Sequence, residues 1–432
     1  MIKAVKDIYV DETIERTAEV HTGGNNPERE EWFRDLALGM FIHWNLDSPL
    51  GGEISHPMIG ASDRILKQYL EDLPARFNPK NFDADDYAAL AETVGMRYFC
   101  FTTKHHAGFC MYDTATNNFN VMNSRYGKDI TGLFVDAFRE RGMGVGLYFS
   151  PLDFYWLLNK GKKLQFMCDD VVPAHNPGLM EYNKTQLAEL LGNYGKIDTV
   201  FFDGPADGLK EQTWNTDSDT IVTRGEMPTP EQYLPDKAIP EVWETCHTIG
   251  SQWNWKATHD VNHSGTELIK LLIETRAKGG NILINVTPDP YGRIPVEQDN
   301  ILRELGLWIF WNKPAVYHAR PWSHLREGDI WYSQEKGTGD IFAYIVDGVV
   351  WERGERREFT LKKVKATDKT KVELVGQNGQ ILEHSYGDRD ISTRWRQTDR
   401  GLYISAVRCY RPYGNMKWHN PVVIRISNAE PA

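Results

Sequence analysis

RYFCFTTKH at 97–105, ITGLFVDAFRERG at 130–142 and GVGLYFSP at 144–151 decide the fold class of this 432-residue chain. The first and third segments are short and rich in aromatic and β-branched residues, which favours strands. The segment between them carries apolar residues at i, i+3 and i+4 spacing, which is typical of an amphipathic helix. A strand, a helix and a second strand in this order predict one βα unit of a parallel sheet.

The same alternation continues through the first three quarters of the chain. About seven such units favour a (β/α)8-like TIM barrel over an open sheet, and no glycine-rich nucleotide-binding motif follows any of the strands. The remaining strand candidates lie at 36–44, 198–204, 219–225, 242–249 and 281–288. The remaining helix candidates lie at 83–95, 179–195, 266–280 and 296–312.

From about Ser323 onward the pattern changes to strands separated by turns rich in glycine, aspartate and asparagine. Segments such as DIFAYIVDG at 340–348 and PVVIRIS at 421–427 predict an all-β unit, which we interpret as a β-sandwich. We therefore expect two domains, a catalytic barrel at 1–322 and a C-terminal β-sandwich at 323–432.

Charge and hydropathy limit the partners of the chain. The formal net charge of −11 argues against nucleic acid, because phosphate binding requires a basic face. The apolar runs are well short of the roughly 18 residues of a membrane helix, so we expect no membrane partner. The amino terminus lacks a secretory leader, which predicts a cytoplasmic protein as given, or an exported one if a leader was removed. A homo-oligomer is compatible with the sequence.

Chemically active side chains gather where the predicted strands end. FIHW carries His43, TTKHHAGF carries His105 and His106, and FFDG carries Asp203. In a barrel the carboxyl ends of the strands carry the chemistry. Histidines, carboxylates and aromatic rings suit a sugar, since rings stack on its apolar face and polar groups bind its hydroxyls.

Six motifs in this order resemble those of the α-L-fucosidase family, glycoside hydrolase family 29. They are GMFIHW, TKHHAGF, GLYFSPLDF, FFDG, WETCHTIGSQW and KGGNILINVTPDPYG, and the resemblance runs from about Glu31 to Trp322. The resemblance implies a barrel followed by a β-sandwich. It also implies a retaining exo-glycosidase that releases terminal α-L-fucose from an oligosaccharide or glycoconjugate, without a cofactor.

The resemblance also implies roles for individual residues. Asp203 of FFDG matches the nucleophile of the family. Fucose binding is implied for seven residues: His43, Glu53, His105, His106, Tyr148, Arg224 and Trp253. The surroundings of Glu53, GGEISHPM, lack the usual Glu-Trp pair of the family. Two further positions depart from the family pattern, with Ala107 in place of an aspartate in KHHDGF and Trp255 in place of a tyrosine, so substrate preference is expected to differ from that of relatives.

The acid/base residue has two candidates, because the family does not keep it at one sequence position. Glu231 lies in a loop, TPEQY, and Glu244 lies on the strand candidate VWETC. A retaining enzyme needs its second carboxyl about 5–5.5 Å from the nucleophile, and either residue can meet this requirement. We favour Glu231.

Structural and functional alternatives remain at this stage. Adjacent histidines suggest a metal site, but we expect none, because neighbours on a strand point to opposite faces. Lys104 and Asp153 are expected to support the site rather than to take part in catalysis. Related activities would be those of an α-L-galactosidase or a transfucosidase, and a catalytically silent carbohydrate-binding protein is the alternative outside enzymes.

Overall fold

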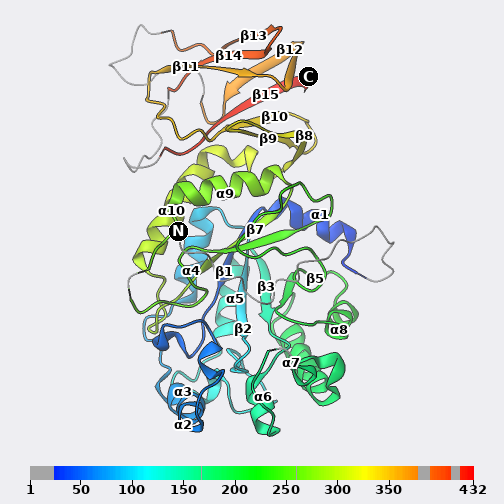
Figure 1. Cartoon of the computed structure of the whole chain (residues 1–432), viewed down its shortest axis with the longest axis vertical. Coiled ribbons are helices and arrows are strands. Elements are labelled where there is room, and N and C mark those ends of the chain that lie inside the picture. Colours follow the sequence, from blue (N-terminus) through cyan, green and yellow to red (C-terminus); the bar gives the residue numbers. More distant parts are fainter. Residues whose placement is uncertain (1–23, 167, 259, 378–389, 410–418) are drawn as a thin grey trace.

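The computed structural model describes residues 24–432 except 167, 259, 378–389 and 410–418. Its first part alternates strands and helices, as the sequence predicts (Figure 1). The strands are β1 (Leu38–Ile42), β2 (Tyr98–Lys104), β3 (Gly144–Phe149), β4 (Thr199–Phe202), β5 (Ile221–Val222), β6 (Glu244–Thr248) and β7 (Asn281–Val286). The main helices are α1 (Pro27–Leu36), α4 (Ala84–Val94), α5 (Ile130–Glu140), α7 (Pro177–Asn193), α8 (Leu209–Thr216), α9 (Gly265–Ala277) and α10 (Val296–Asn312).

These strands form one curled parallel sheet in the order β5-β4-β3-β2-β1-β7-β6. The chain between β5 and β6 runs beside β6, where the carbonyls of Pro228 and Pro230 accept 3.2 Å hydrogen bonds from the N–H groups of Glu244 and Cys246. The parallel α/β architecture is thus confirmed. Seven strands are assigned to this sheet within the described residues, so a closed eight-stranded barrel stays a prediction.

The two faces of the sheet have separate apolar clusters. On β1, Met40 and Ile42 pack against the helices, while Phe41 points to the inner, concave side. Because side chains alternate along a strand, residues two positions beyond the inner-face Phe41 and Phe201 emerge at the carboxyl edge of the inner face. Those residues are His43 and Asp203.

The described residues of the C-terminal part form two antiparallel sheets that share one apolar cluster. The first has the order β12-β15-β10-β9-β8 and the second β11-β14-β13. Their strands are β8 (Ala319–Glu327), β9 (Ile330–Glu335), β10 (Ile341–Ile345), β11 (Arg356–Leu361), β12 (Val364–Leu374), β13 (Arg394–Thr398), β14 (Gly401–Val407) and β15 (Val422–Pro431). The predicted boundary at 322/323 falls within β8 and stays a prediction.

The C-terminal sheets and the strand ends with the chemical residues lie at opposite ends of the parallel sheet. Arg276 at the end of α9 donates to the carbonyls of Val316 and Ala319 and to Oδ1 of Asn281, the first residue of β7. The amino ends of the strands therefore face the C-terminal part. Three short helices that follow the carboxyl ends of strands lie at the end of the molecule away from the C-terminal sheets (Figure 1). They are α2 (Asp63–Lys67), α3 (Leu73–Arg76) and α6 (Phe154–Asn159). In the described part of the chain, no helix is long and apolar enough to span a membrane.

Candidate active site

Asp203 comes directly after β4 and is bound through both carboxylate oxygens. Oδ2 accepts a 2.5 Å hydrogen bond from the Tyr148 hydroxyl, and Oδ1 accepts a 3.0 Å bond from Nη1 of Arg224. Burial raises the pKa of Asp203, but the charge of His106, which is present at the acidic pH where Asp203 titrates, the charge of Arg224 and the Tyr148 hydrogen bond outweigh it, so the pKa lies below its ordinary value. The carboxyl is ionised at neutral pH, and its side chain stays 23% exposed.

Arg224 joins Asp203 to a second carboxylate. Its Nη2 donates a 2.6 Å hydrogen bond to Oε2 of Glu231, and its guanidinium lies 4.6 Å from the centre of the Phe201 ring. Glu231 belongs to the segment that runs beside β6, where it pairs with Cys246. One guanidinium thus brings together two carboxylates that are far apart in the sequence.

His106 lies on the other side of Asp203, with Nε2 3.4 Å from Oδ2. Its Nδ1 is 2.6 Å from Oγ of Ser150, whose proton goes to the carbonyl of Leu152. Nδ1 must therefore be the donor, which leaves Nε2 of the neutral ring as an acceptor. Burial lowers the pKa of His106 to about 4, so the ring is neutral at pH 7 and Arg224 supplies the positive charge beside Asp203.

His105 and His43 complete a group of neutral imidazoles. Nδ1 of His105 is 2.8 Å from Oγ of Ser55, and its ring stacks on Tyr148 at an interplanar angle of 4°. Nδ1 of His43 is 2.8 Å from Oδ1 of Asn285. Burial lowers the pKa of His43 to about 3 and that of His105 well below its ordinary value.

The aromatic side of the site is formed by Trp253. Its ring centre lies 4.8 Å from that of His43, and its carbonyl accepts a hydrogen bond from Nδ2 of Asn285. Because Nδ2 of Asn285 donates to the Trp253 carbonyl, the other amide atom, Oδ1, faces His43. Nδ1 of His43 must then be the donor of that bond, and Nε2 of the neutral ring is left as an acceptor. Oε2 of Glu53 accepts a 3.3 Å bond from the N–H of Trp253.

Glu244 is not part of this group. It is the first residue of β6 and fully buried, and Oε2 accepts a hydrogen bond from the hydroxyl of Tyr98, the first residue of β2. Oε1 has no hydrogen-bond partner among the described residues. Burial raises the pKa of Glu244 to about 8, so the carboxyl is neutral at pH 7. It lies at the amino edge of the sheet, whereas Glu231 is at the carboxyl edge with Asp203.

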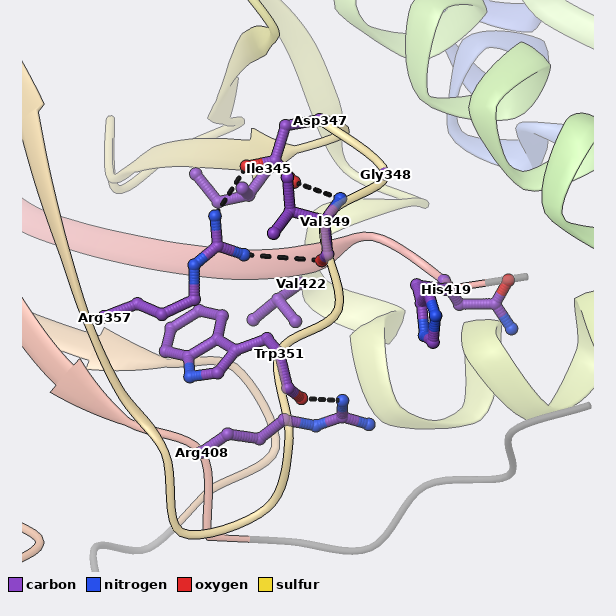
Figure 2. A pocket seen from close by; sticks show the side chains of 10 residues that line it. Ile345, Asp347, Gly348, Val349, Trp351, Arg357, Arg408, His419 and Val422 are labelled. Atoms are coloured by element: carbon purple, nitrogen blue, oxygen red, sulfur yellow. Dashed lines mark hydrogen bonds and ion pairs between the residues drawn. The ribbon is translucent and has the colours of Figure 1, made fainter. Parts of the chain in front are cut away.

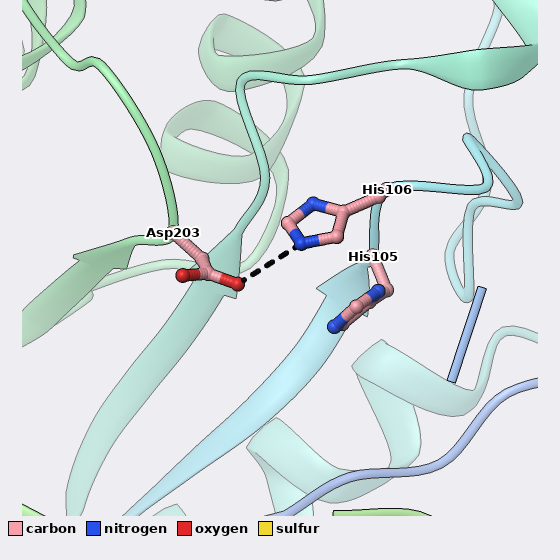
Figure 3. Close-up of side chains that lie close together, drawn as sticks. All are labelled: His105, His106 and Asp203. Carbon is pink, nitrogen blue, oxygen red and sulfur yellow. Dashed lines mark ion pairs between the residues drawn. The ribbon is translucent and has the colours of Figure 1, made fainter. Parts of the chain in front are cut away.

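His105, His106 and Asp203 form a group whose ligand-type atoms all lie within 4.8 Å of one another (Figure 3). The expectation that the two histidines point to opposite faces is wrong. Strand β2 ends at Lys104, so both follow in a turn, and their ring centres are 4.2 Å apart. The donor set could suit a metal such as zinc, but both Nδ1 atoms and both Asp203 oxygens already have protein partners.

Lys104 and Asp153 lie behind the site, as expected for supporting residues. Nζ of Lys104 is 3.3 Å from Oδ2 of Asp153 and donates to Oδ1 of Asn183 and Oε1 of Gln186. Oδ1 of Asp153 accepts the N–H of Trp156 and so caps α6.

Four supporting residues escaped the sequence reasoning: Asp47, Ser55, Ser150 and Asn285. Ser150 and Asn285 could have been predicted, since each lies at or near the end of a predicted strand, and the adjacent strands carry site residues at the same edge of the sheet. Asp47 and Ser55 lie in an irregular loop, where no periodicity of the sequence predicts their contacts.

A separate small pocket lies in the C-terminal part between Asp347, Trp351 and Val422 (Figure 2). Nη2 of Arg357 donates a 2.6 Å bond to Asp347, and Nη1 of Arg408 donates to the carbonyl of Trp351. The pocket has room for about one water molecule. Both arginines thus bind other residues that line the pocket, and we assign it no ligand.

Several known proteins are similar to this chain in sequence and in fold. The family model described as Alpha-L-fucosidase matches residues 11–313. A putative α-L-fucosidase of Caenorhabditis elegans is 27% identical over 418 residues, which cover 82% of this chain and 83% of that protein. The plasma α-L-fucosidase of Homo sapiens is 27% identical over 359 residues, or 72% and 75% of the two chains.

Solved structures show the same fold. α-L-Fucosidase isoenzyme 1 from Paenibacillus thiaminolyticus superposes with a TM-score of 0.75 at 23% identity, covering 93% of this chain and 99% of that chain. A trapped covalent intermediate of a family 29 α-L-fucosidase from Bacteroides thetaiotaomicron gives a TM-score of 0.73 at 22% identity, covering 95% and 98%.

The fold and the family match define a glycoside hydrolase. The chain belongs to the α-L-fucosidase family, glycoside hydrolase family 29, and this family implies a fucosylated glycan as substrate.

Proposed function

We propose that this protein is a retaining α-L-fucosidase that removes a terminal α-L-fucose from an oligosaccharide or glycoconjugate by double displacement. The observation that carries the proposal is the binding of Asp203 and Glu231 by the two Nη atoms of Arg224. Retaining glycosidases use two carboxyl groups that lie close to each other, and the shared guanidinium holds Asp203 and Glu231 on one side of the site.

In the first step, Asp203 attacks the anomeric carbon as the bond to the leaving oxygen breaks, and Glu231 gives its proton to that oxygen. In the second step, water attacks the fucosyl-enzyme, returns a proton to Glu231 and frees Asp203. The pKa of Asp203 lies below its ordinary value, which keeps the nucleophile charged. In its ion pair with Arg224, Glu231 is a carboxylate without a proton to give. The pair must therefore open, and Glu231 must take up a proton from water, before the first step.

The neutral histidines supply hydrogen bonds for the sugar. Nε2 of His43 and Nε2 of His106 are acceptors and so suit hydroxyl donors of fucose. Trp253 offers an apolar face suited to the C5 methyl group, and Glu53 holds the backbone of that tryptophan. Hydroxyl patterns are recognised more sharply than a single methyl group, which is worth only about 1–3 kcal/mol.

The test uses an aryl α-L-fucoside, which needs little acid assistance. The wild type should hydrolyse it, and Asp203→Ala should not, at unchanged folding by circular dichroism. Azide added to Asp203→Ala should give β-fucosyl azide, the inverted product of direct attack. Wild-type activity in Asp203→Ala would remove Asp203 from the mechanism, and a wild type that binds L-fucose without cleaving the fucoside would indicate a carbohydrate-binding protein.

A further inference from the structure

Asp47 lies in the loop after β1 and is fully buried, although no catalytic step uses it. Its Oδ2 accepts 2.7 Å hydrogen bonds from the N–H of Ser55 and from the hydroxyl of Tyr69. Its Oδ1 accepts a 3.4 Å bond from Nδ2 of Asn254. We propose that Asp47 is a positioning residue for fucose binding, which holds the loops after β1, β2 and β6 in one fixed arrangement. The proposal rests on the proposed function.

The first connection runs through Ser55 to the histidines. Ser55 has a φ of 68°, in the left-handed region that non-glycine residues rarely adopt, at a cost of about 1–3 kcal/mol. Its N–H is held by Asp47, and its Oγ accepts a 2.9 Å bond from the N–H of Ala107 and lies 2.8 Å from Nδ1 of His105. The strained backbone therefore aims one hydroxyl at the loop that carries His105.

The second connection runs through Asn254 to the aromatic side of the site. Its Nδ2 donates to Asp47 and, at 3.1 Å, to the carbonyl of Gly52, while its Oδ1 accepts the N–H of Trp255 at 2.9 Å. The residue before it, Trp253, bonds to Glu53 of the β1 loop. Asn254 thus fastens the β6 loop to the same carboxylate that fastens Ser55.

A carboxylate suits this junction because all of its partners are donors. Burial raises the pKa of Asp47 to about 6, so at pH 7 the ionised group can accept all three bonds. An asparagine at this position keeps one oxygen for Ser55 and Tyr69 but turns an amide NH2 toward the NH2 of Asn254. The network is thus arranged to fix Glu53, His105 and Trp253, whereas Asp203 and Glu231 are held by Arg224 outside it.

The variant Ser55→Gly distinguishes a role in positioning His105 from a role in the stability of the fold. Glycine adopts a φ of 68° without strain, which offsets part of the cost of the lost hydrogen bonds. The melting temperature should therefore fall only slightly, while the hydroxyl that braces His105 is lost. With an aryl α-L-fucoside we expect kcat/KM to drop by about tenfold or more, mainly through a raised KM, because small displacements of binding groups are costly. Asp47→Asn should also raise KM more than it lowers kcat, because it disturbs the bond to Asn254.

Asp129→Asn is the matched control. Asp129 also accepts a backbone N–H, from Gly132 at 2.9 Å, and a tyrosine hydroxyl, from Tyr194 at 2.6 Å, but it caps α5 away from the site. The Asp129→Asn variant should lower the melting temperature without changing KM. A Ser55→Gly enzyme with KM within about twofold of wild type, or with kcat lowered at constant KM as in partial unfolding, would overturn the proposal.

A readout independent of turnover separates this proposal from the proposed function. A crystal structure of Ser55→Gly should show His105 and the backbone of Ala107 displaced from their wild-type positions. If the wild type cleaves no fucoside, the proposed function fails, and the displacement still tests the positioning role. An unmoved His105 in Ser55→Gly would refute that role even in an active enzyme.

Discussion

The Tyr148 hydroxyl donates a 2.5 Å hydrogen bond to Oδ2 of Asp203, so the tyrosine contacts the oxygen that also faces His106. This bond favours the charged carboxylate and contributes to the lowered pKa of Asp203. Tyr148 therefore does more than line the site, since its hydroxyl helps to orient the proposed nucleophile and to keep it ionised.

Tyr148→Phe should therefore lower kcat/KM by about 10- to 100-fold, since a hydrogen bond to a charged group is worth about 1.5–3 kcal/mol. The pKa of Asp203 should rise, so the acid limb of the pH profile of kcat/KM should move to higher pH. Tyr344→Phe is the control, because Tyr344 is equally buried but its hydroxyl donates to the carbonyl of Ala315, far from the site. An acid limb that stays in place in Tyr148→Phe would contradict the role of this bond.

Glu231→Ala and Glu244→Ala should differ in how they respond to azide. Glu231→Ala should lose most activity on a natural glycoside but keep its first step on an aryl fucoside with an acidic phenol. Azide should rescue it with a product of retained configuration, since it attacks the fucosyl-enzyme without a general base. Glu244→Ala should show neither the substrate difference nor rescue, because Glu244 lies at the amino edge of the sheet. Retained-product rescue of Glu244→Ala alone would reverse the assignment.

Much of the fold follows from the sequence, because strands and helices there have clear periodicity. All seven strand candidates of the first part contain a strand, and β5 differs most, with only Ile221 and Val222 paired. The place of Glu244 could also have been predicted. It stands near the start of the strand candidate 242–249, and in a parallel sheet a residue at a strand start lies at the edge opposite the site.

The rest depends on irregular loops that no periodicity describes. The left-handed Ser55 and the link from Asp47 to Asn254 bring together residues about 200 positions apart in the sequence, as the separation of 207 between Asp47 and Asn254 shows. The turn that places His105 and His106 on one side begins at the end of β2, and strand bounds are the least certain part of a sequence-based prediction. The loop geometry therefore required the three-dimensional structure.

Exhaustive chelation should leave kcat/KM unchanged, although His105, His106 and Asp203 cluster within 4.8 Å. Asp203 already binds Tyr148 and Arg224, and the Arg224 charge disfavours a cation beside it. The measurement is turnover of an aryl fucoside after dialysis against a chelator, with a mock-dialysed sample as the control. Loss of activity that added zinc restores would revive a metal mechanism.

Glu244→Gln should change how stability depends on pH. The pKa of Glu244 rises from 4.5, its ordinary value, to about 8 in the folded protein, because burial disfavours the charge. Between these two values the folded state holds a proton that the unfolded state has released. The free energy of unfolding therefore falls as the pH rises from about 4.5 to about 8, and it levels off above that.

For a fully buried group this loss is on the order of a few kcal/mol. Glutamine is neutral at every pH and nearly isosteric, so Glu244→Gln should match the wild type near pH 4.5 and become more stable than it by pH 8. The measurement is the melting temperature of both proteins at one scan rate between pH 4.5 and 9. Glu140→Gln, at an exposed position on α5, is the control and should follow the wild-type curve. If the Glu244→Gln curve also runs parallel to the wild type, Glu244 does not hold a proton in the folded state at neutral pH.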